Sequence, residues 1–282
     1  QLNAIRELLA QDEASLLANI DRLPQEIRFK SPSGSIKVLE LSWLPILHAS
    51  SHVSKIMLTL RDVTQLAELK QREHEAGRAV QDSLLGRSEN LPGITLASFY
   101  RAAEFLGGDW YGCYQDPLRR RIFLFIGDVT GHGTPSALMT GAVSGAIAMR
   151  FLDMEKIDAD TERFLDTLTL DLHRIVLNTG QKTGRMMTMA FIAIDQTTGI
   201  CHYRNAGHPY MMVCRDSSVR ECVIPGDPLG FKDTPRIGRK LLSLTPGDTL
   251  ILFTDGLFER PKNLNLGLNA RRLQRLVSGK SP

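Results

Sequence analysis

Residues 107–133 read GGDWYGCYQDPLRRRIFLFIGDVTGHG, and the rest of the chain is organised around this stretch. At its centre, residues 122–126 are all apolar and show no polar alternation. A short apolar run of this kind predicts a strand that is buried on both faces. Asp128 follows near the carboxyl end of that strand, just before a glycine-rich loop, and Asp109 precedes the strand on the neighbouring segment.

These acids allow two interpretations. An aspartate beside glycine is commonly a turn former, whereas two acids brought to one end of adjacent strands can form a carboxylate metal site. Asp255 repeats the arrangement, because it follows the strand pattern of residues 249–254, whose residues 250–253 are apolar, and precedes Gly256. The recurrence favours a metal site, and carboxylates without histidine or cysteine partners favour magnesium or manganese over zinc. We interpret His132 and His208 as loop histidines that bond the backbone rather than as ligands.

Composition limits the classes of protein that the chain can belong to. With 282 residues, 43% hydrophobic and 23% charged, it can bury a normal globular core in one large domain or two. A net charge of +3 does not suggest nucleic acid as a partner, and we interpret the basic residues 271–275 as a solvated helix face. The cysteines show no zinc-type spacing and predict a reducing compartment, so we expect a cytoplasmic protein. No apolar run is long enough to cross a bilayer, and no signal-peptide pattern is present.

The first 64 residues are predicted to form a small sensor-like region. Residues 1–23 have helical periodicity, and residues 25–30, 36–46 and 53–63 have the pattern of strands. The pattern resembles the last strands of a PAS-like sensor domain, which often end in Asp-Val-Thr as residues 62–64 do here. Most of such a domain would be missing, so we expect a remnant of it over residues 1–64.

Residues 65–90 are predicted to be a helical linker. The segment 65–85 is charged, lacks proline and carries apolar residues near heptad spacing, interrupted by Glu73. The heptad positions are Leu66, Leu69, Ala76, Val80 and Leu84. Two interpretations stay open: a coiled coil that makes a homodimer through residues 65–85, and a single solvated spacer helix.

Residues 91–282 are predicted to form one α+β domain. Strand patterns at residues 94–100 and 122–126 are followed by helical patterns at 135–152 and 161–177. Strand patterns then return in a group, at residues 186–194, 200–205, 209–214, 219–224, 240–244 and 249–254. Strands grouped with strands indicate a layered α+β fold rather than a doubly wound one.

The order of the glycine- and acid-containing motifs is similar to that of a known family. The motifs are Gly107-Gly108-Asp109-Trp110-Tyr111, Gly127-Asp128-Val129-Thr130-Gly131-His132-Gly133, Asn205-Ala206-Gly207-His208, Pro228-Leu229-Gly230 and Thr254-Asp255-Gly256-Leu257-Phe258-Glu259. Over roughly residues 80–260 the chain resembles the SpoIIE-like phosphatases, a bacterial branch of the metal-dependent PPM (protein phosphatase 2C-like) family. Its upstream sensor and helix resemble the RsbU type of regulator.

The resemblance implies a fold and a metal centre. The fold would be a PPM-type sandwich of two antiparallel β-sheets flanked by helices, with two Mn²⁺ or Mg²⁺ ions at one end. Asp128 would bridge the two metals, the backbone carbonyl of Val129 would bind one of them, and Asp109 and Asp255 would complete the coordination. Thr130, Gly131 and His132 would contact the substrate.

The resemblance also implies an activity. A metal-activated water would hydrolyse phosphoserine or phosphothreonine, which makes the chain a protein serine/threonine phosphatase of bacterial signalling. Its partner would be a phosphorylated regulatory protein, of which a STAS-type anti-sigma factor antagonist is the expected example.

The sequence departs from the family pattern in two places. Family members that hold the substrate phosphate with an arginine place it shortly before the first acid, and Arg101 is only a loose candidate for that role. A further strand with a metal-binding aspartate normally follows, whereas residues 264–277 suit a helix. We therefore expect residues 91–282 to be a C-terminally incomplete phosphatase domain with weak activity.

Two other functions compete with that of a phosphatase. One is a catalytically weak or inactive PPM-fold module that acts by binding a partner, which the missing segment favours and the retained acids disfavour. The other is a nucleotide cyclase, since Gly-Gly-Asp also opens the diguanylate cyclase signature. The residues after Asp109 and the later motifs do not fit that signature.

Overall fold

The computed structural model describes residues 18–47, 53–86, 91, 93–102, 106–153, 157–216, 218–258 and 270–277. The chain divides into two compact units, Gln1–Ala76 and Gly77–Pro282, and each is described here by itself. The helix predicted over residues 1–23 lies largely outside the described residues, which begin at residue 18. They include a short 3₁₀ turn, η1 (Ile20–Arg22). The three-part division at residues 64 and 90 stays a prediction.

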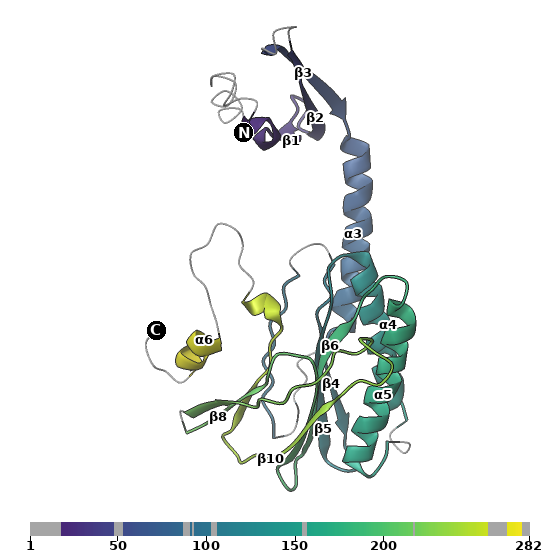
Figure 1. Cartoon of the computed structure of the whole chain (residues 1–282), viewed down its shortest axis with the longest axis vertical. Coiled ribbons are helices and arrows are strands. Elements are labelled where there is room, and N and C mark those ends of the chain that lie inside the picture. Colours follow the sequence, from purple (N-terminus) through teal and green to yellow (C-terminus); the bar gives the residue numbers. More distant parts are fainter. Residues whose placement is uncertain are drawn as a thin grey trace. The chain divides into compact units, whose positions relative to one another are not determined.

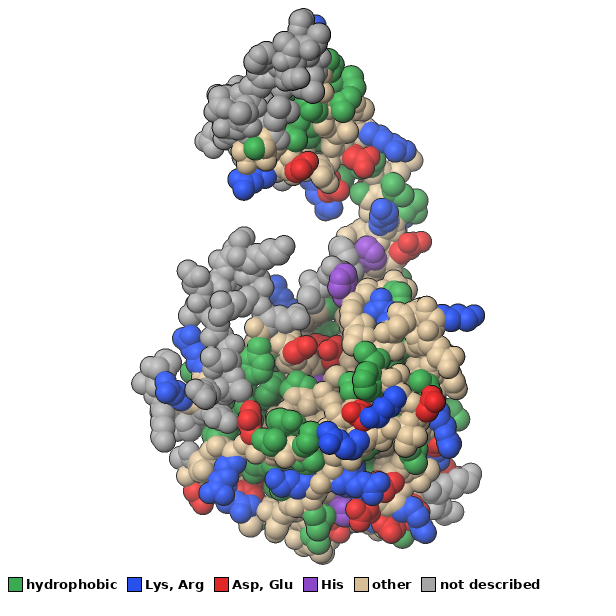
Figure 2. Space-filling view, viewed as in Figure 1, with side chains coloured by type: hydrophobic (Ala, Val, Ile, Leu, Met, Phe, Trp, Pro, Cys, Tyr) green, Lys and Arg blue, Asp and Glu red, His purple; other side chains and the backbone are tan. Residues whose placement is uncertain are grey.

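The first unit holds a three-stranded antiparallel sheet in the order β1-β2-β3 (Figure 1). Its strands are β1 (Glu26–Lys30), β2 (Ile36–Leu47) and β3 (Val53–Asp62), as the sequence predicted. Gly34 makes the first turn possible, since its φ of +90° is a conformation that other residues rarely adopt. Several large apolar side chains are exposed on this sheet, including Ile36 and Leu60, and Figure 2 shows apolar side chains on the surface of this unit. The PAS-like assignment stays a prediction.

A helix, α3 (Thr64–Leu84), follows β3 directly and confirms the predicted linker helix. Asp62 caps its start, because the backbone N–H of Thr64 donates to Asp62 Oδ1 at 3.0 Å. The apolar side chains of Leu66, Leu69 and Val80 are 51%, 59% and 62% exposed, so they are not used in the folded chain's core. Pairing of two copies through them stays a prediction.

The second unit contains two antiparallel sheets. A five-stranded sheet has the order β10-β7-β6-β5-β4, and a three-stranded sheet has the order β11-β8-β9. The strands are β4 (Trp110–Asp116), β5 (Arg121–Val129), β6 (Met187–Asp195), β7 (Ile200–Ala206), β8 (Met212–Arg215), β9 (Ser218–Glu221), β10 (Gly238–Ser243) and β11 (Thr249–Ile251). The central strands β5 and β6 pair over their whole lengths, from Arg121 with Asp195 to Val129 with Met187.

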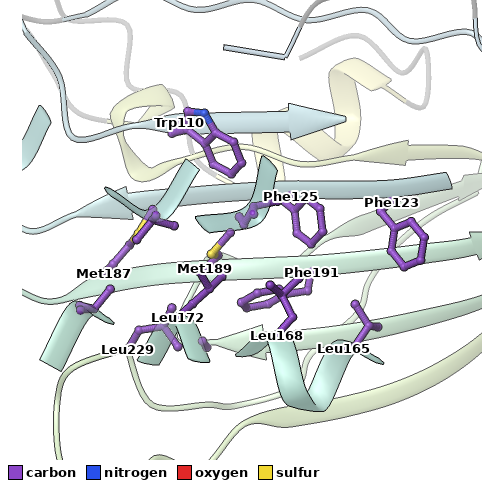
Figure 3. Packing of buried hydrophobic residues seen from close by; sticks show 14 of the residues in the cluster. Trp110, Phe123, Phe125, Leu165, Leu168, Leu172, Met187, Met189, Phe191 and Leu229 are labelled. Atoms are coloured by element: carbon purple, nitrogen blue, oxygen red, sulfur yellow. The ribbon is translucent and has the colours of Figure 1, made fainter. Parts of the chain in front are cut away.

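Two helices, α4 (Thr134–Phe151) and α5 (Thr161–Gly180), lie side by side against one face of the five-stranded sheet (Figure 1). Phe123, Phe125 and Phe191 of the sheet pack here with Leu168 and Leu172 of α5 (Figure 3). All five side chains are at most 2% exposed. A buried apolar contact of this size is the main stabilising term for such a layer.

The opposite face of the five-stranded sheet carries a second apolar core. Ile122 and Leu124, which alternate with Phe123 and Phe125 along β5, pack there. Val213 of β8 and Leu250 of β11 pack against the same cluster, so the three-stranded sheet covers this face. The second unit is therefore a sandwich of two antiparallel sheets with helices outside it, as the family resemblance implied. Cys201 and Cys222 are buried as free thiols in this core and pack there as small apolar side chains.

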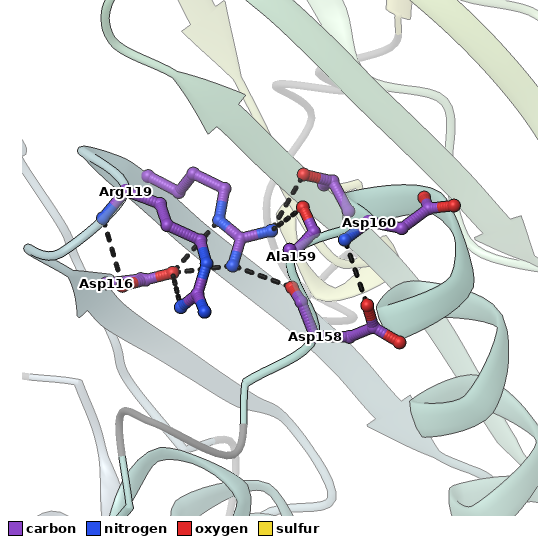
Figure 4. Close-up of polar contacts among 7 residues, drawn as sticks. Asp116, Arg119, Asp158, Ala159 and Asp160 are labelled. Atoms are coloured by element: carbon purple, nitrogen blue, oxygen red, sulfur yellow. Dashed lines mark hydrogen bonds and ion pairs between the residues drawn. The ribbon is translucent and has the colours of Figure 1, made fainter.

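A buried ion pair joins the far end of β4 and β5 to the start of α5. The Arg121 guanidinium lies 2.6 Å from Asp116 Oδ2, and these side chains are 3% and 0% exposed. Arg121 also donates to the backbone carbonyls of Asp158 and Ala159, in the network that Figure 4 shows around Asp116, Arg119 and Asp158. Such a pair stabilises the fold only while every charged group keeps its partners.

Three details of the sequence prediction were wrong. Residues 95–100 form no strand, and Ile94 makes only an isolated bridge, to Leu91. Ile94 and Leu96 pack on the core without a backbone ladder, while Phe99 is 89% exposed. The last predicted strand, residues 249–254, ends early at Ile251. The strand pair predicted over residues 209–214 and 219–224 is shorter, with β8 at Met212–Arg215 and β9 at Ser218–Glu221.

The described helices include none that is both long enough and apolar enough to span a lipid bilayer.

Candidate metal centre

The three predicted acids come from segments that meet at one end of the sandwich. Asp109 lies directly before β4 and Asp128 near the end of β5, and the two strands align Trp110 with Gly127. Asp255 begins a 3₁₀ turn, η3 (Asp255–Leu257), after β11. The turn is tied to the first acid, because Thr254 Oγ1 donates to Asp109 Oδ2 at 2.9 Å. The structure therefore brings together acids that are up to 146 positions apart in the sequence.

The surroundings of Asp109 make its negative charge costly. Burial raises the pKa of its carboxyl, hydrogen bonds with Thr254 and Asp128 lower that pKa, and the charge of Asp255 raises it again. Two carboxylates that share a hydrogen bond must share a proton, unless a cation lies between them. This cluster is therefore suited to a proton or to a positive ion.

Backbone oxygens converge beside the acids at Gly108. A Cβ atom at this position would lie 2.5 Å from the carbonyl oxygen of Val129, 3.2 Å from Asp128 Oδ1 and 3.3 Å from the carbonyl oxygen of Gly131. No side chain fits into that space, so the position requires glycine. Thr140 Oγ1 of α4 donates to the Gly108 carbonyl oxygen at 3.0 Å and fixes its direction.

This donor set fits a hard divalent cation. Among the described residues, no three histidine, cysteine, aspartate or glutamate side chains form a metal-binding group by themselves. Two carboxylates supplemented by backbone carbonyls and water are the ligands that Mg²⁺ and Mn²⁺ accept, while Zn²⁺ prefers nitrogen and sulfur. Asp109, Asp128 and the Val129 carbonyl are the groups that could hold such an ion, with Asp255 close enough to act on Asp109 electrostatically.

The loop after Asp128 is fixed by hydrogen bonds at Thr130 and is exposed to solvent at Gly131 and His132. Thr130 exchanges backbone and side-chain hydrogen bonds with Met186, while Gly131 and His132 are exposed. Arg185 braces the loop, because its Nη1 donates to the Thr130 carbonyl oxygen and to Ser136 Oγ, each at 2.6 Å. Thr130 is thus committed to the backbone, and Gly131 and His132 remain accessible to a substrate.

His208 is connected to the candidate metal centre through Thr188. It is 3% exposed, and its Nδ1 is 3.0 Å from Thr188 Oγ1, which in turn lies 3.5 Å from the Asp128 carbonyl oxygen. The Asn205 side chain accepts from the His208 backbone N–H and donates to its carbonyl, both at 2.8 Å. Burial lowers the pKa of His208 to about 4, so the ring is neutral at physiological pH. Its contacts agree with the interpretation as a hydrogen-bonding histidine.

Sequence reasoning missed several residues that shape this centre. Arg185, Thr188 and Thr254 all contact it, yet each looks ordinary in the sequence. Only Thr254 gave a signal, as the residue before Asp255 in a quoted motif. Arg101, the loose candidate for a phosphate-binding residue, is exposed, and nothing in its described surroundings connects it to the acids.

Similarity to known proteins agrees with this geometry. The chain is 28% identical over 192 residues to the phosphoserine phosphatase RsbP of Bacillus subtilis; the match covers 67% of this chain and 45% of that protein, so the chain spans less than half of its relative. The solved SiaA-PP2C domain of Pseudomonas aeruginosa has the same fold, with a TM-score of 0.61 at 18% identity, covering 77% of this chain and 84% of that one.

The family itself follows from a match over more than half of the sequence. Residues 119–282 match the model of the family described as stage II sporulation protein E (SpoIIE). The matched region contains Asp128, Asp255 and every strand from β5 to β11. The resemblance seen in the motifs is thereby confirmed: the chain belongs to the SpoIIE family, whose fold is that of the PPM, or protein phosphatase 2C-like, phosphatases.

Proposed function

We propose that this chain is a metal-dependent protein serine/threonine phosphatase of bacterial signalling. The observation that carries the proposal is the meeting of Asp109, Asp128 and the Thr254–Asp255 turn beside converging backbone oxygens. The relationship to a phosphoserine phosphatase supports the same reaction class. Two divalent ions, Mn²⁺ or Mg²⁺, are the proposed cofactors.

The proposed metal ligands are carboxylate side chains and one backbone carbonyl oxygen. Asp128 and the Val129 carbonyl would hold one ion, with Asp128 shared between both ions and Asp109 and Asp255 completing the set. When bound, such ions make a water molecule more acidic and neutralise the negative charge of the phosphoryl group. The chain's own residues orient the ligands: Thr254 directs Oδ2 of Asp109, and the hydrogen bonds of Thr140 hold the peptide beside it.

The exposed edge of the site is suited to a phosphorylated side chain on another protein. Gly131 and His132 are exposed next to the acids, and Arg185 adds a positive charge beneath the same loop. A phosphoserine carries about two negative charges at neutral pH and three strong acceptor oxygens, so it would be attracted to the Arg185 guanidinium and to cations held by the acids. A regulatory protein, such as a STAS-type anti-sigma factor antagonist, is the proposed substrate.

A second candidate function is a catalytically weak or inactive PPM-fold module that acts by binding a partner. One observation favours it: the described residues after η3 form a helix, α6 (Ala270–Val277), and not a strand with a further acid. The retained acids at Asp109, Asp128 and Asp255 favour the enzyme.

Phosphate release from a phosphoserine peptide, measured with the whole chain as Mn²⁺ is titrated, distinguishes the two. We expect Asp128→Asn to lower turnover by at least about 100-fold, since a ligand shared by the reactive ions is lost. Asp233→Asn, at an exposed loop position, is the matched control and should keep wild-type turnover. Wild-type turnover in Asp128→Asn at saturating Mn²⁺ would show that the site is wrong. A wild-type chain that binds Mn²⁺ and hydrolyses nothing would favour the partner-binding module.

A further inference from the structure

Gln81 lies in the last turn of α3 and is buried against the segment that carries Asp109. Its side chain is 4% exposed. Its Nε2 donates to the carbonyl oxygen of Gly107 at 2.6 Å, and its Oε1 accepts from the backbone N–H of Gly107 at 3.1 Å. A neutral amide donates and accepts at the same time, so glutamine can pair with both polar groups of one residue and is long enough to reach them.

The segment around Asp109 depends on such outside contacts. Gly107 and Gly108 have no side chains of their own, and glycine has more backbone freedom than any other residue. Gly108 is held by Thr140 Oγ1 and by the N–H of Val129, and the indole N–H of Trp110 donates to the Leu84 carbonyl oxygen at 2.7 Å. Gln81 restrains the backbone on the amino-terminal side of Asp109, through its two hydrogen bonds to Gly107.

Little space is left for a side chain at either Gly107 or Gly108. A Cβ atom at Gly107 would lie 2.6 Å from the hydroxyl of Tyr100, and one at Gly108 would lie 2.5 Å from the Val129 carbonyl oxygen. The chain therefore restrains this peptide through partners on α3, α4 and β5. Of these partners, Gln81 is the one that satisfies both polar groups of a single residue.

We propose that Gln81 is a positioning residue that holds the Asp109 carboxylate in place for a divalent cation. The inference rests on the proposed function for its choice of ligand. Removing the amide leaves the N–H and carbonyl of Gly107 without their partner, and a buried unpaired polar group is costly. The Gly107–Gly108 peptide then turns toward another partner and carries Asp109 with it. Residues that orient a metal ligand in this indirect way typically change metal affinity by about 10- to 100-fold when mutated.

The test measures Mn²⁺ binding to the whole chain by titration calorimetry, without substrate. Gln81→Met has nearly the same length and removes both hydrogen bonds. Gln71→Met is the matched control, because Gln71 lies on the same helix but bonds only the exposed Glu75. We expect the Kd for Mn²⁺ to rise at least about 10-fold in Gln81→Met and to stay within about 2-fold in Gln71→Met. The thermal midpoint of each variant is recorded beside it.

A Gln81→Met protein that binds Mn²⁺ with the wild-type Kd while its thermal midpoint falls would overturn the inference, since Gln81 would then be structural only. Should Gln81→Met not fold, Gln81→Asn decides by the same comparison of Kd, because its amide is uncharged and one methylene too short to make both hydrogen bonds to Gly107. A wild-type chain that binds no Mn²⁺ overturns this inference and the proposed function together. A chain that binds Mn²⁺ but releases no phosphate overturns only the proposed function, because the Kd values still decide the role of Gln81.

Discussion

Lowering the pH should destabilise the second unit through His208. Burial lowers the pKa of this histidine from 6.5 to about 4, and a backbone hydrogen bond at Phe253 offsets part of that shift. The unfolded chain therefore takes up a proton at a higher pH than the folded chain does. The contribution of His208 to stability is complete above pH 6.5 and is lost progressively as the pH falls from 6.5 toward 4.

The size of this effect follows from the shift. One pKa unit is worth about 1.4 kcal/mol, so the complete loss is about 3 kcal/mol, of which about 2 kcal/mol is already lost at pH 5. This is a large part of the stability of an ordinary domain, which is roughly 5–15 kcal/mol. The carboxyl groups titrate in the same range, so the measurement needs a variant that differs only at this position.

Urea unfolding of the wild type and of His208→Gln at pH 7.5, 6 and 5 provides that comparison. Trp110 is 1% exposed and reports on the second unit, and Trp43→Phe in both proteins leaves it as the only tryptophan. Between pH 7.5 and 5 the wild type should lose about 2 kcal/mol more of its free energy of unfolding than His208→Gln does. Equal losses in the two proteins would show that the folded chain does not hold His208 neutral.

Three other predictions follow from the packing. Asp116→Ala should lower the free energy of unfolding of the second unit by about 3–5 kcal/mol, because Arg121 is left buried without its counter-charge; a change below about 1 kcal/mol in urea unfolding would contradict the account of that pair. Gly108→Ala should abolish Mn²⁺ binding in calorimetry, since its Cβ would lie 2.5 Å from the Val129 carbonyl oxygen; wild-type affinity would exclude that oxygen from the site. A fragment of residues 1–90 should sediment as a dimer, and a strict monomer at high concentration would leave α3 a passive spacer.

The strands of the second unit could be predicted from sequence because burial on both faces requires an uninterrupted run of apolar residues. In β5, Phe123 and Phe125 enter one core while Ile122 and Leu124 enter the other. A strand between two cores cannot alternate with polar residues, and the run of five apolar residues shows this. Residues 94–100 carried a similar pattern without forming a strand, since apolar burial does not reveal whether a backbone has a partner.

The acids of the candidate site were also accessible from sequence, because each follows or precedes a buried strand beside glycine. Their supporting residues were not. Thr254 contacts Asp109 across 145 positions, and Gln81 reaches Gly107 across 26. Nothing in the local sequence marks Gln81, because glutamine is a common polar residue of helices, and Thr254 is marked only by its place before Asp255 in a motif. Only the fold, which brings distant segments into contact, assigns them a role.

The central claim is that the acids of this chain form one divalent-cation centre for phosphoserine hydrolysis. The most direct measurement is phosphate release from a phosphoserine peptide by the whole chain, first after treatment with a chelator and then with Mn²⁺ restored. The account predicts no release after chelation, recovery with Mn²⁺, and no recovery in Asp109→Asn at the same Mn²⁺ concentration. Release that persists in the chelator, or an Asp109→Asn protein that recovers as fully as the wild type, would contradict it.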